Sequence, residues 1–242
     1  MTDRHPAITT ATADRFPQEP AMTTFRTTTS HVPAPARTDV APPAPVPPDP
    51  LSACSAALSG TLRLLGAGLA AGAGAYGVAF MTSGAESEQG SFAISLTGLF
   101  FQLGVFCLLA AMWRTRATGT SRLARTMLVV ESVVLAVATV QSVFTLPADG
   151  GEWGTVATVL DPFWPLSMLG MAIIGVKVAV AGRWRGALRA WPVVAETWIF
   201  VALPSLMVFG REIGSVVAGT HFLVGYAVLG LLLAVRPELT RR

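Results

Sequence analysis

Hydrophobic residues gather in six long stretches, separated by short polar connections and preceded by a polar segment of about 57 residues. As an α-helix, a stretch of about 20 residues is long enough to cross the ~30 Å hydrocarbon core of a bilayer. Unpaired backbone polar groups are costly in lipid, so such stretches are expected to be helical. The pattern predicts an all-α integral membrane protein, a six-transmembrane-helix bundle. Its expected spans are about 61–81, 92–113, 126–146, 162–181, 190–209 and 213–235.

The connections between these spans alternate in charge. Arginines follow the second, fourth and sixth spans: Arg114, Arg116, Arg122, Arg125; Arg183, Arg185, Arg189; Arg236, Arg241, Arg242. The other connections carry Glu86 and Glu88, Asp149 and Glu152, and Arg211 with Glu212. Because positive charge resists translocation, the arginine-bearing connections and both termini are expected to be cytoplasmic.

The polar segment 1–57 differs in composition from the rest of the chain. It holds most of the 17 prolines and few large apolar residues, so we expect a disordered cytoplasmic tail. Residues 58–236 then form one transmembrane domain, and 237–242 a short cytoplasmic C-terminus. A plain tether is the favoured role for the tail, a docking or phosphorylation segment is the alternative, and Met22 is an alternative start.

Composition narrows the class of protein. The chain is 52% hydrophobic and only 13% charged, with a mean hydropathy of +0.57, whereas soluble domains carry about 25% charged residues. The net charge is +3, and the basic residues that follow the tail lie mostly at span ends. Anionic lipid headgroups are therefore the expected partners rather than nucleic acid. With one lysine, no asparagine and abundant Ala, Gly, Val and Arg, the chain is typical of a GC-rich bacterial genome, which indicates a bacterial plasma membrane.

Ionisable residues within membrane spans are costly and are functional candidates by default. Glu131, Lys177 and Glu196 lie at similar distances from the cytoplasmic ends of three consecutive spans. The spacing predicts an intramembrane charge cluster in the inner half of the bundle. Three interpretations stay open: an ion-pair lock, a lysine that extends to the headgroups, and a proton or cation site.

His221 is the only histidine within a predicted span. A bis-histidine haem needs two histidines in the bundle, and a zinc site needs further ligands, so no metal or cofactor is expected. Ser167 on the fourth span and His221 on the sixth resemble the arrangement in rhomboid intramembrane proteases. The segment around the serine, residues 164–168, lacks the Gly-x-Ser-Gly motif of that family, so a protease is disfavoured.

Two further features concern helix packing. Gly68 and Gly72 form a small-xxx-small pair on the first span, which favours close packing inside the monomer over a dimer face. Pro204 lies deep in the fifth span and is a candidate kink or hinge.

Short loops and the lack of a chemical motif favour a non-enzymatic accessory or regulatory membrane protein, acting through its tail or its first span. The alternative is a small proton-linked secondary transporter that uses Glu131, Lys177 and Glu196. A polar cavity around those side chains would favour the transporter. A sealed core with an exposed patch of small residues would favour the accessory protein.

Overall fold

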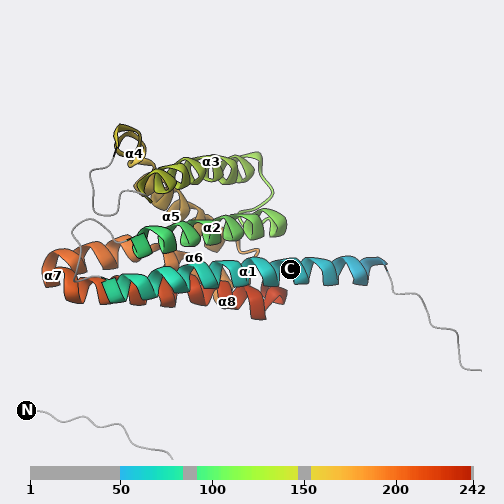
Figure 1. Cartoon of the computed structure of the whole chain (residues 1–242). Helices are drawn as coiled ribbons and strands as arrows, with labels where there is room; N and C mark the ends of the chain where they lie inside the picture. The colour runs from blue at the N-terminus through green and yellow to red at the C-terminus, as the bar shows by residue number, and fades with distance from the viewer. Residues whose placement is uncertain (1–49, 84–91, 147–153, 241–242) are drawn as a thin grey trace, which may run out of the picture. The chain divides into compact units, whose positions relative to one another are not determined.

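The computed structural model describes residues 50–83, 92–146 and 154–240, which all belong to one compact unit, Pro47–Arg242. These residues form helices and no strand (Figure 1). The predicted tail over residues 1–49 and the acidic residues Glu86, Glu88, Asp149 and Glu152 lie outside the described residues.

Eight α-helices, a π-helix and a 3₁₀ turn make up the described chain. In order they are α1 Pro50–Ser83, α2 Phe92–Thr115, α3 Arg122–Thr145, α4 Thr155–Leu160, α5 Phe163–Ala181, α6 Ala187–Glu196, α7 Trp198–Phe222, the π-helix η1 Leu223–Ala227, α8 Val228–Val235 and the 3₁₀ turn η2 Pro237–Thr240.

Helix α1 begins earlier than predicted, at Pro50 rather than near Thr61. Residues 50–57, assigned to the tail from composition, therefore belong to a helix. Proline is well suited to the first helical position, where its missing N–H is not needed. The Leu, Ala and Ser residues that follow it place no helix breaker before Gly60.

Five helical segments among the described residues are long and apolar enough to cross a membrane. They are Cys54–Thr82, Phe92–Thr115, Arg122–Thr145, Thr155–Ala181 and Ala187–Val235. The prediction of an all-α chain with several helices able to cross a membrane is confirmed, with five such segments among the described residues where six spans were predicted.

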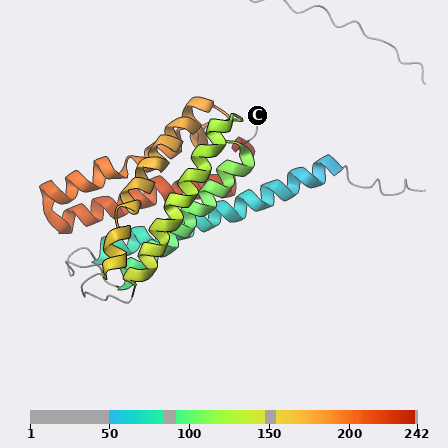
Figure 2. The same cartoon turned by 90° about the horizontal axis from the view of Figure 1, so that it is seen from above.

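The fifth of these segments reverses direction at Gly210, where the backbone has φ 72° and ψ −177°. Residues on either side of the reversal pack against each other, as Gly214 does against Leu206. Farther along, the Trp191 Nε1–H donates to the carbonyl of Gly225 over 3.0 Å. Figure 2 shows the resulting hairpin in orange and red.

Helix α1 contacts α2 on one side and α7, η1 and α8 on another, while α3 packs on α2 and α5, and α5 packs on α6. The contact between α1 and its neighbours is close because glycines meet there. A Cβ at Gly72 would overlap the carbonyl oxygen of Phe100, and a Cβ at Gly66 would lie 2.5 Å from that of Gly230. Gly68 also faces α2, against the thiol of Cys107.

A cluster of aromatic rings fills the core where α1, α2, α7 and η1 meet. Tyr76 stacks on Phe101 with ring centroids 5.5 Å apart, and Phe222 meets Tyr76 edge to face at 4.9 Å. Tyr226 on η1 lies edge to face with Phe101 at 4.9 Å. Edge-to-face and offset ring pairs are the favoured aromatic geometries, so this cluster fixes how the four elements pack.

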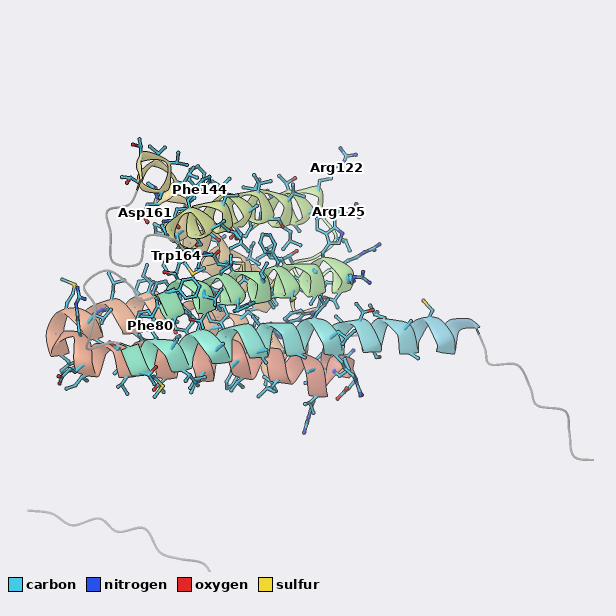
Figure 3. The ribbon with its side chains drawn as sticks, viewed as in Figure 1. Phe80, Arg122, Arg125, Phe144, Asp161 and Trp164 are labelled. Carbon is cyan, nitrogen blue, oxygen red and sulfur yellow. The ribbon has the colours of Figure 1, made fainter. Side chains whose placement is uncertain are left out.

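The arginine-bearing connections lie at the same end of the unit. The Trp184 Nε1–H, between α5 and α6, donates to Thr115 Oγ1 at the end of α2 over 3.0 Å. The backbone N–H of Arg185 donates to the carbonyl of Leu239 in η2 over 2.8 Å. Figure 3 shows Arg122 and Arg125 at one end of α3, with Phe144 at the opposite end.

Candidate functional site

Two buried carboxyl groups are the most unusual chemical feature of the interior. Glu131 on α3 is 3% exposed and Glu196 at the end of α6 is 5% exposed. Burying a carboxyl group is costly unless it is hydrogen-bonded, paired with a cation or neutralised by a proton. The surroundings of each group therefore decide what it can do.

Glu131 is held against α5. The Ser167 hydroxyl donates a 2.6 Å hydrogen bond to Glu131 Oε1. The other oxygen lies against Gly170, where an added Cβ would overlap Oε2. Ser167 and Gly170 are three residues apart on one helix face. A hydroxyl and an absent side chain on α5 thus create the space that the carboxyl occupies.

The carboxyl of Glu131 also lines a cleft between α3 and α5. The cleft has a volume of about 280 Å³ and is otherwise apolar; it is lined by Thr126, Met127, Val130, Glu131, Gly170, Ile173 and Ile174. Val130 and Ile173 are more than half exposed, so the cleft lies at the outer surface of the two helices. Glu131 is therefore buried but only a short distance from that surface.

Glu196 lies deeper, between α5, α6 and η1. Its side chain lies beside Gly175, where a Cβ would be 3.4 Å from the Glu196 Cγ. Tyr226 on η1 and Glu131 on α3 are near enough to interact with it electrostatically. Within the described residues, however, neither Glu196 Oε2 nor the Tyr226 hydroxyl has a hydrogen-bond partner. Glu196 and Tyr226 are thus neighbouring buried polar groups.

Lys177 does not join the two carboxyl groups. It is half-buried near the end of α5, and over the part of the chain that the structure describes no ion pair links it to Glu131 or Glu196. The reason lies in where each carboxyl meets α5. Glu131 lies beside Gly170, seven positions before Lys177. Glu196 lies beside Gly175, two positions before Lys177, and two positions on a helix point to nearly opposite faces.

His221 and Ser167 do not form a catalytic pair. His221 Nε2 lies 3.2 Å from the carbonyl oxygen of Ala195 on α6, and the Ser167 hydroxyl is bonded to Glu131. Each side chain therefore holds two helices together. Pro204 lies within α7 and is exposed, but the non-helical backbone of that helix is at Gly210.

A second polar group lies near the opposite end of α3. Gln102 on α2 is buried, and its Nε2 donates to Ser142 Oγ over 2.8 Å. Gln141 Nε2 approaches Asp161 Oδ1 at 3.5 Å, beyond α4. The face of α3 that carries Glu131, Gln141 and Ser142 thus points into the bundle.

Sequence reasoning missed three residues of the site: Gly170, Gly175 and Tyr226. Gly170 follows Ser167 by three positions, so the helical period would have placed both on one face. Gln102, in the second polar group, was also missed. A polar amide within an apolar span is unusual for the same reason as an ionisable residue, because burying it in the membrane is costly. Nothing in the sequence places Tyr226 beside Glu196, because that contact depends on the hairpin at Gly210.

Among the described residues, no group of three or more His, Cys, Asp or Glu side chains is arranged to hold a metal ion. No known protein family, curated protein or solved structure matches the chain. The class of protein is therefore defined by the fold itself: a helical chain with several helices able to cross a membrane and with two carboxyl groups buried among them.

Proposed function

We propose that this chain is a small proton-linked secondary transporter of a bacterial plasma membrane, with Glu131 and Glu196 as its proton-binding groups. The observation that carries the proposal is that two carboxyl groups from different helices, Glu131 and Glu196, are both buried against α5, with no basic partner among the described residues. The cleft beside Glu131 is otherwise apolar, so the proposal rests on the buried carboxyl groups and not on a polar cavity. Intramembrane carboxyl groups that face a bundle interior are typical of proton relays and ion pathways.

The proposed topology has six passes with both termini in the cytoplasm. The hairpin at Gly210 divides the segment Ala187–Val235 into two parts of membrane length, and Arg211 and Glu212 would then lie outside. The gathering of the arginine-bearing connections at one end supports a cytoplasmic position for that end.

The packing around the carboxyl groups supports a role for both of them. Gly170 makes room for the Glu131 carboxyl, and Gly175 lets the α6 backbone approach α5 closely. Tyr226 belongs to a π-helix, an element that occurs often at functional sites. A change in protonation of Glu196 would act directly on the contact between α6 and η1.

The other interpretation, an accessory protein that docks through small residues of α1, has less support. Gly66, Gly72 and Gly77 each lie against the backbone of a neighbouring helix, so these glycines are already used in packing within the chain. An accessory role through the tail stays a prediction, because that segment lies outside the described residues.

The test is proton binding and proton-coupled flux by the full-length protein. Purified protein is titrated between acidic and alkaline pH with a pH-sensitive dye, and infrared spectroscopy follows the carbonyl band of protonated carboxyl groups. Glu131→Gln and Glu196→Gln should each remove part of that band and of the proton uptake. Glu212→Gln, which changes an exposed carboxyl at the hairpin, is the matched control and should leave the band unchanged.

The same variants are then compared in liposomes that contain a pH dye, with sugars, amino acids and inorganic cations offered across a proton gradient. Solute-dependent proton entry is expected for the wild type and for Glu212→Gln, and should be lost in Glu131→Gln and Glu196→Gln. Equal proton uptake by the wild type and the double Gln variant would overturn the proposal.

A further inference from the structure

A basic pocket lies where α2 turns into α3. It has a volume of about 220 Å³ and is lined by Trp113, Arg116, Thr118, Gly119, Arg125 and Leu128. Arg116 and Arg125 are both exposed, and no carboxyl group is among these lining residues. The pocket is therefore positively charged and open to an anion.

The loop that forms this pocket has an unusual backbone. Arg116 has φ 52°, in the left-handed region that side chains other than glycine rarely adopt. Hydrogen bonds from the N–H of Ala117 to the carbonyl of Met112, and from that of Gly119 to the carbonyl of Arg116, hold the loop in place. An arginine kept where glycine would fit better points to a use for its guanidinium group.

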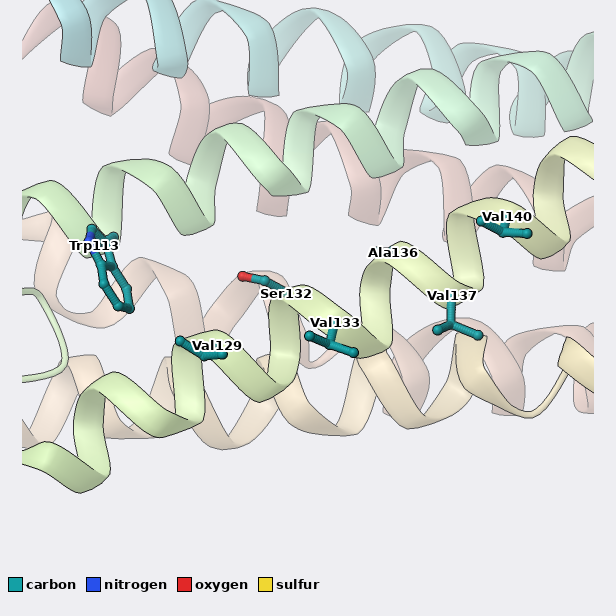
Figure 4. Close-up of a pocket in the computed structure, with 7 residues that line it drawn as sticks. All are labelled: Trp113, Val129, Ser132, Val133, Ala136, Val137 and Val140. Atoms are coloured by element: carbon teal, nitrogen blue, oxygen red, sulfur yellow. The ribbon is translucent and has the colours of Figure 1, made fainter.

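An apolar groove continues from the pocket along α3. It has a volume of about 410 Å³ and is lined by Trp113, Val129, Ser132, Val133, Ala136, Val137 and Val140 (Figure 4). Trp113 belongs to both the groove and the basic pocket. From Val129 to Val140 the groove follows α3 for about 16 Å, roughly half of a ~30 Å hydrocarbon core and so the depth of one leaflet.

We propose that the pocket and the groove together bind one phospholipid with an anionic headgroup. The phosphate would lie between Arg116 and Arg125, and one acyl chain would follow the groove along α3. Guanidinium groups bind phosphate oxygens through paired, charge-assisted hydrogen bonds. The first turn of α3 adds the positive end of a helix dipole near Arg125.

Each part of this arrangement has a separate physical role. The indole of Trp113 is suited to the boundary between headgroups and hydrocarbon, which is where the pocket meets the groove. A free phosphate would use the pocket but not the groove, and a neutral lipid would use the groove but not the arginines. The proposal requires the chain to lie in a bilayer and is independent of proton binding at Glu131 and Glu196.

The experiment measures lipid retention by native mass spectrometry of the full-length protein from micelles that contain phosphatidylglycerol and phosphatidylcholine in equal amounts. The wild type should retain phosphatidylglycerol preferentially. Arg116→Gln with Arg125→Gln should lower that preference by about tenfold, as expected when charge-assisted hydrogen bonds are lost. Arg63→Gln with Arg236→Gln removes the same charge from exposed sites elsewhere and should leave the preference unchanged.

Two further variants separate the parts of the site. Arg116→Gly suits the left-handed backbone, so it should fold at least as well as the wild type and still lose the preference. Ala136→Trp fills the groove and should reduce lipid retention, whereas Val143→Trp, on an exposed part of α3 outside the groove, should not.

Three results would overturn the proposal. One is equal retention of the two lipids by the wild type. Another is the same loss of preference in the Arg63/Arg236 control as in the Arg116/Arg125 variant. The third is competition by glycerol phosphate as strong as that of the intact lipid, which would indicate a site for a free anion.

Discussion

The Ser167 hydroxyl on α5 donates a 2.6 Å hydrogen bond to Glu131 on α3, and this is a direct link between two side chains across the α3–α5 interface. Both residues are buried, so each depends on the other for its hydrogen bond. Leaving a buried polar group unpaired costs about 1–3 kcal/mol. The pair is therefore both a structural contact and the point where a change at Glu131 reaches α5.

Ser167→Ala should lower the free energy of unfolding in detergent by about 1–3 kcal/mol, because Glu131 loses its donor. Ser132→Ala is the control: its hydroxyl bonds only the carbonyl of Leu128 in its own helix, so the loss should be smaller. Combining Ser167→Ala with Glu131→Gln should give a coupling energy of about 0.5–3 kcal/mol between the two sites. Strict additivity would contradict the link.

Gly170→Ala should destabilise the protein by about 1–3 kcal/mol, because the new methyl group would overlap Glu131 Oε2 and displace the carboxyl from the Ser167 hydroxyl. A buried polar group left unpaired costs about that much. Glu131→Ala in the same chain should relieve much of the loss. Gly74→Ala, on a helix position with open space around it, is the control and should be neutral or stabilising. Thermal unfolding in one detergent compares all four proteins.

Lys177→Met should change the free energy of unfolding by no more than about 0.5 kcal/mol. The reason is that Lys177 makes no ion pair with Glu131 or Glu196 in the described structure, and its long side chain can extend toward the headgroups. Breaking a buried ion pair would instead cost about 3–5 kcal/mol. A loss of that size, restored by Glu131→Gln or Glu196→Gln, would show that the three charges form a lock after all.

The hydrophobic pattern predicted the helices well because length and apolar content are local properties of the sequence. It placed the charges less well, because positions counted along each span do not say which face of the helix a residue occupies or where the helix begins. Helix α3 begins at Arg122, four residues before the predicted span, which moves Glu131 deeper than Lys177. The partners of Glu131 and Glu196, Gly170 and Gly175, depend on how the helices rotate and pack, and no single span contains that information.

Gly210→Ala should destabilise the hairpin between the two parts of α7. The conformation at Gly210, φ 72° and ψ −177°, is essentially restricted to glycine, and another residue there costs about 1–3 kcal/mol. The residue is exposed and has no atom within 4 Å of an added Cβ, so the cost is conformational rather than steric. Thermal unfolding would detect the loss. Gly60→Ala, in an open position on helix α1, should show none.

The hairpin also makes a prediction about topology. Residues 187–209 and 211–235 each span about 34 Å or more as helices, enough for one pass each. Cysteines are introduced singly at Glu212 and Arg185 after Cys54 and Cys107 are replaced by serine. Both introduced positions are exposed, so both can react. In intact cells an impermeant maleimide should label Glu212→Cys, and should label Arg185→Cys only after the membrane is opened. Labelling of both positions from the same side would mean that the two arms of the hairpin do not each cross the membrane, and the six-pass topology would then be wrong.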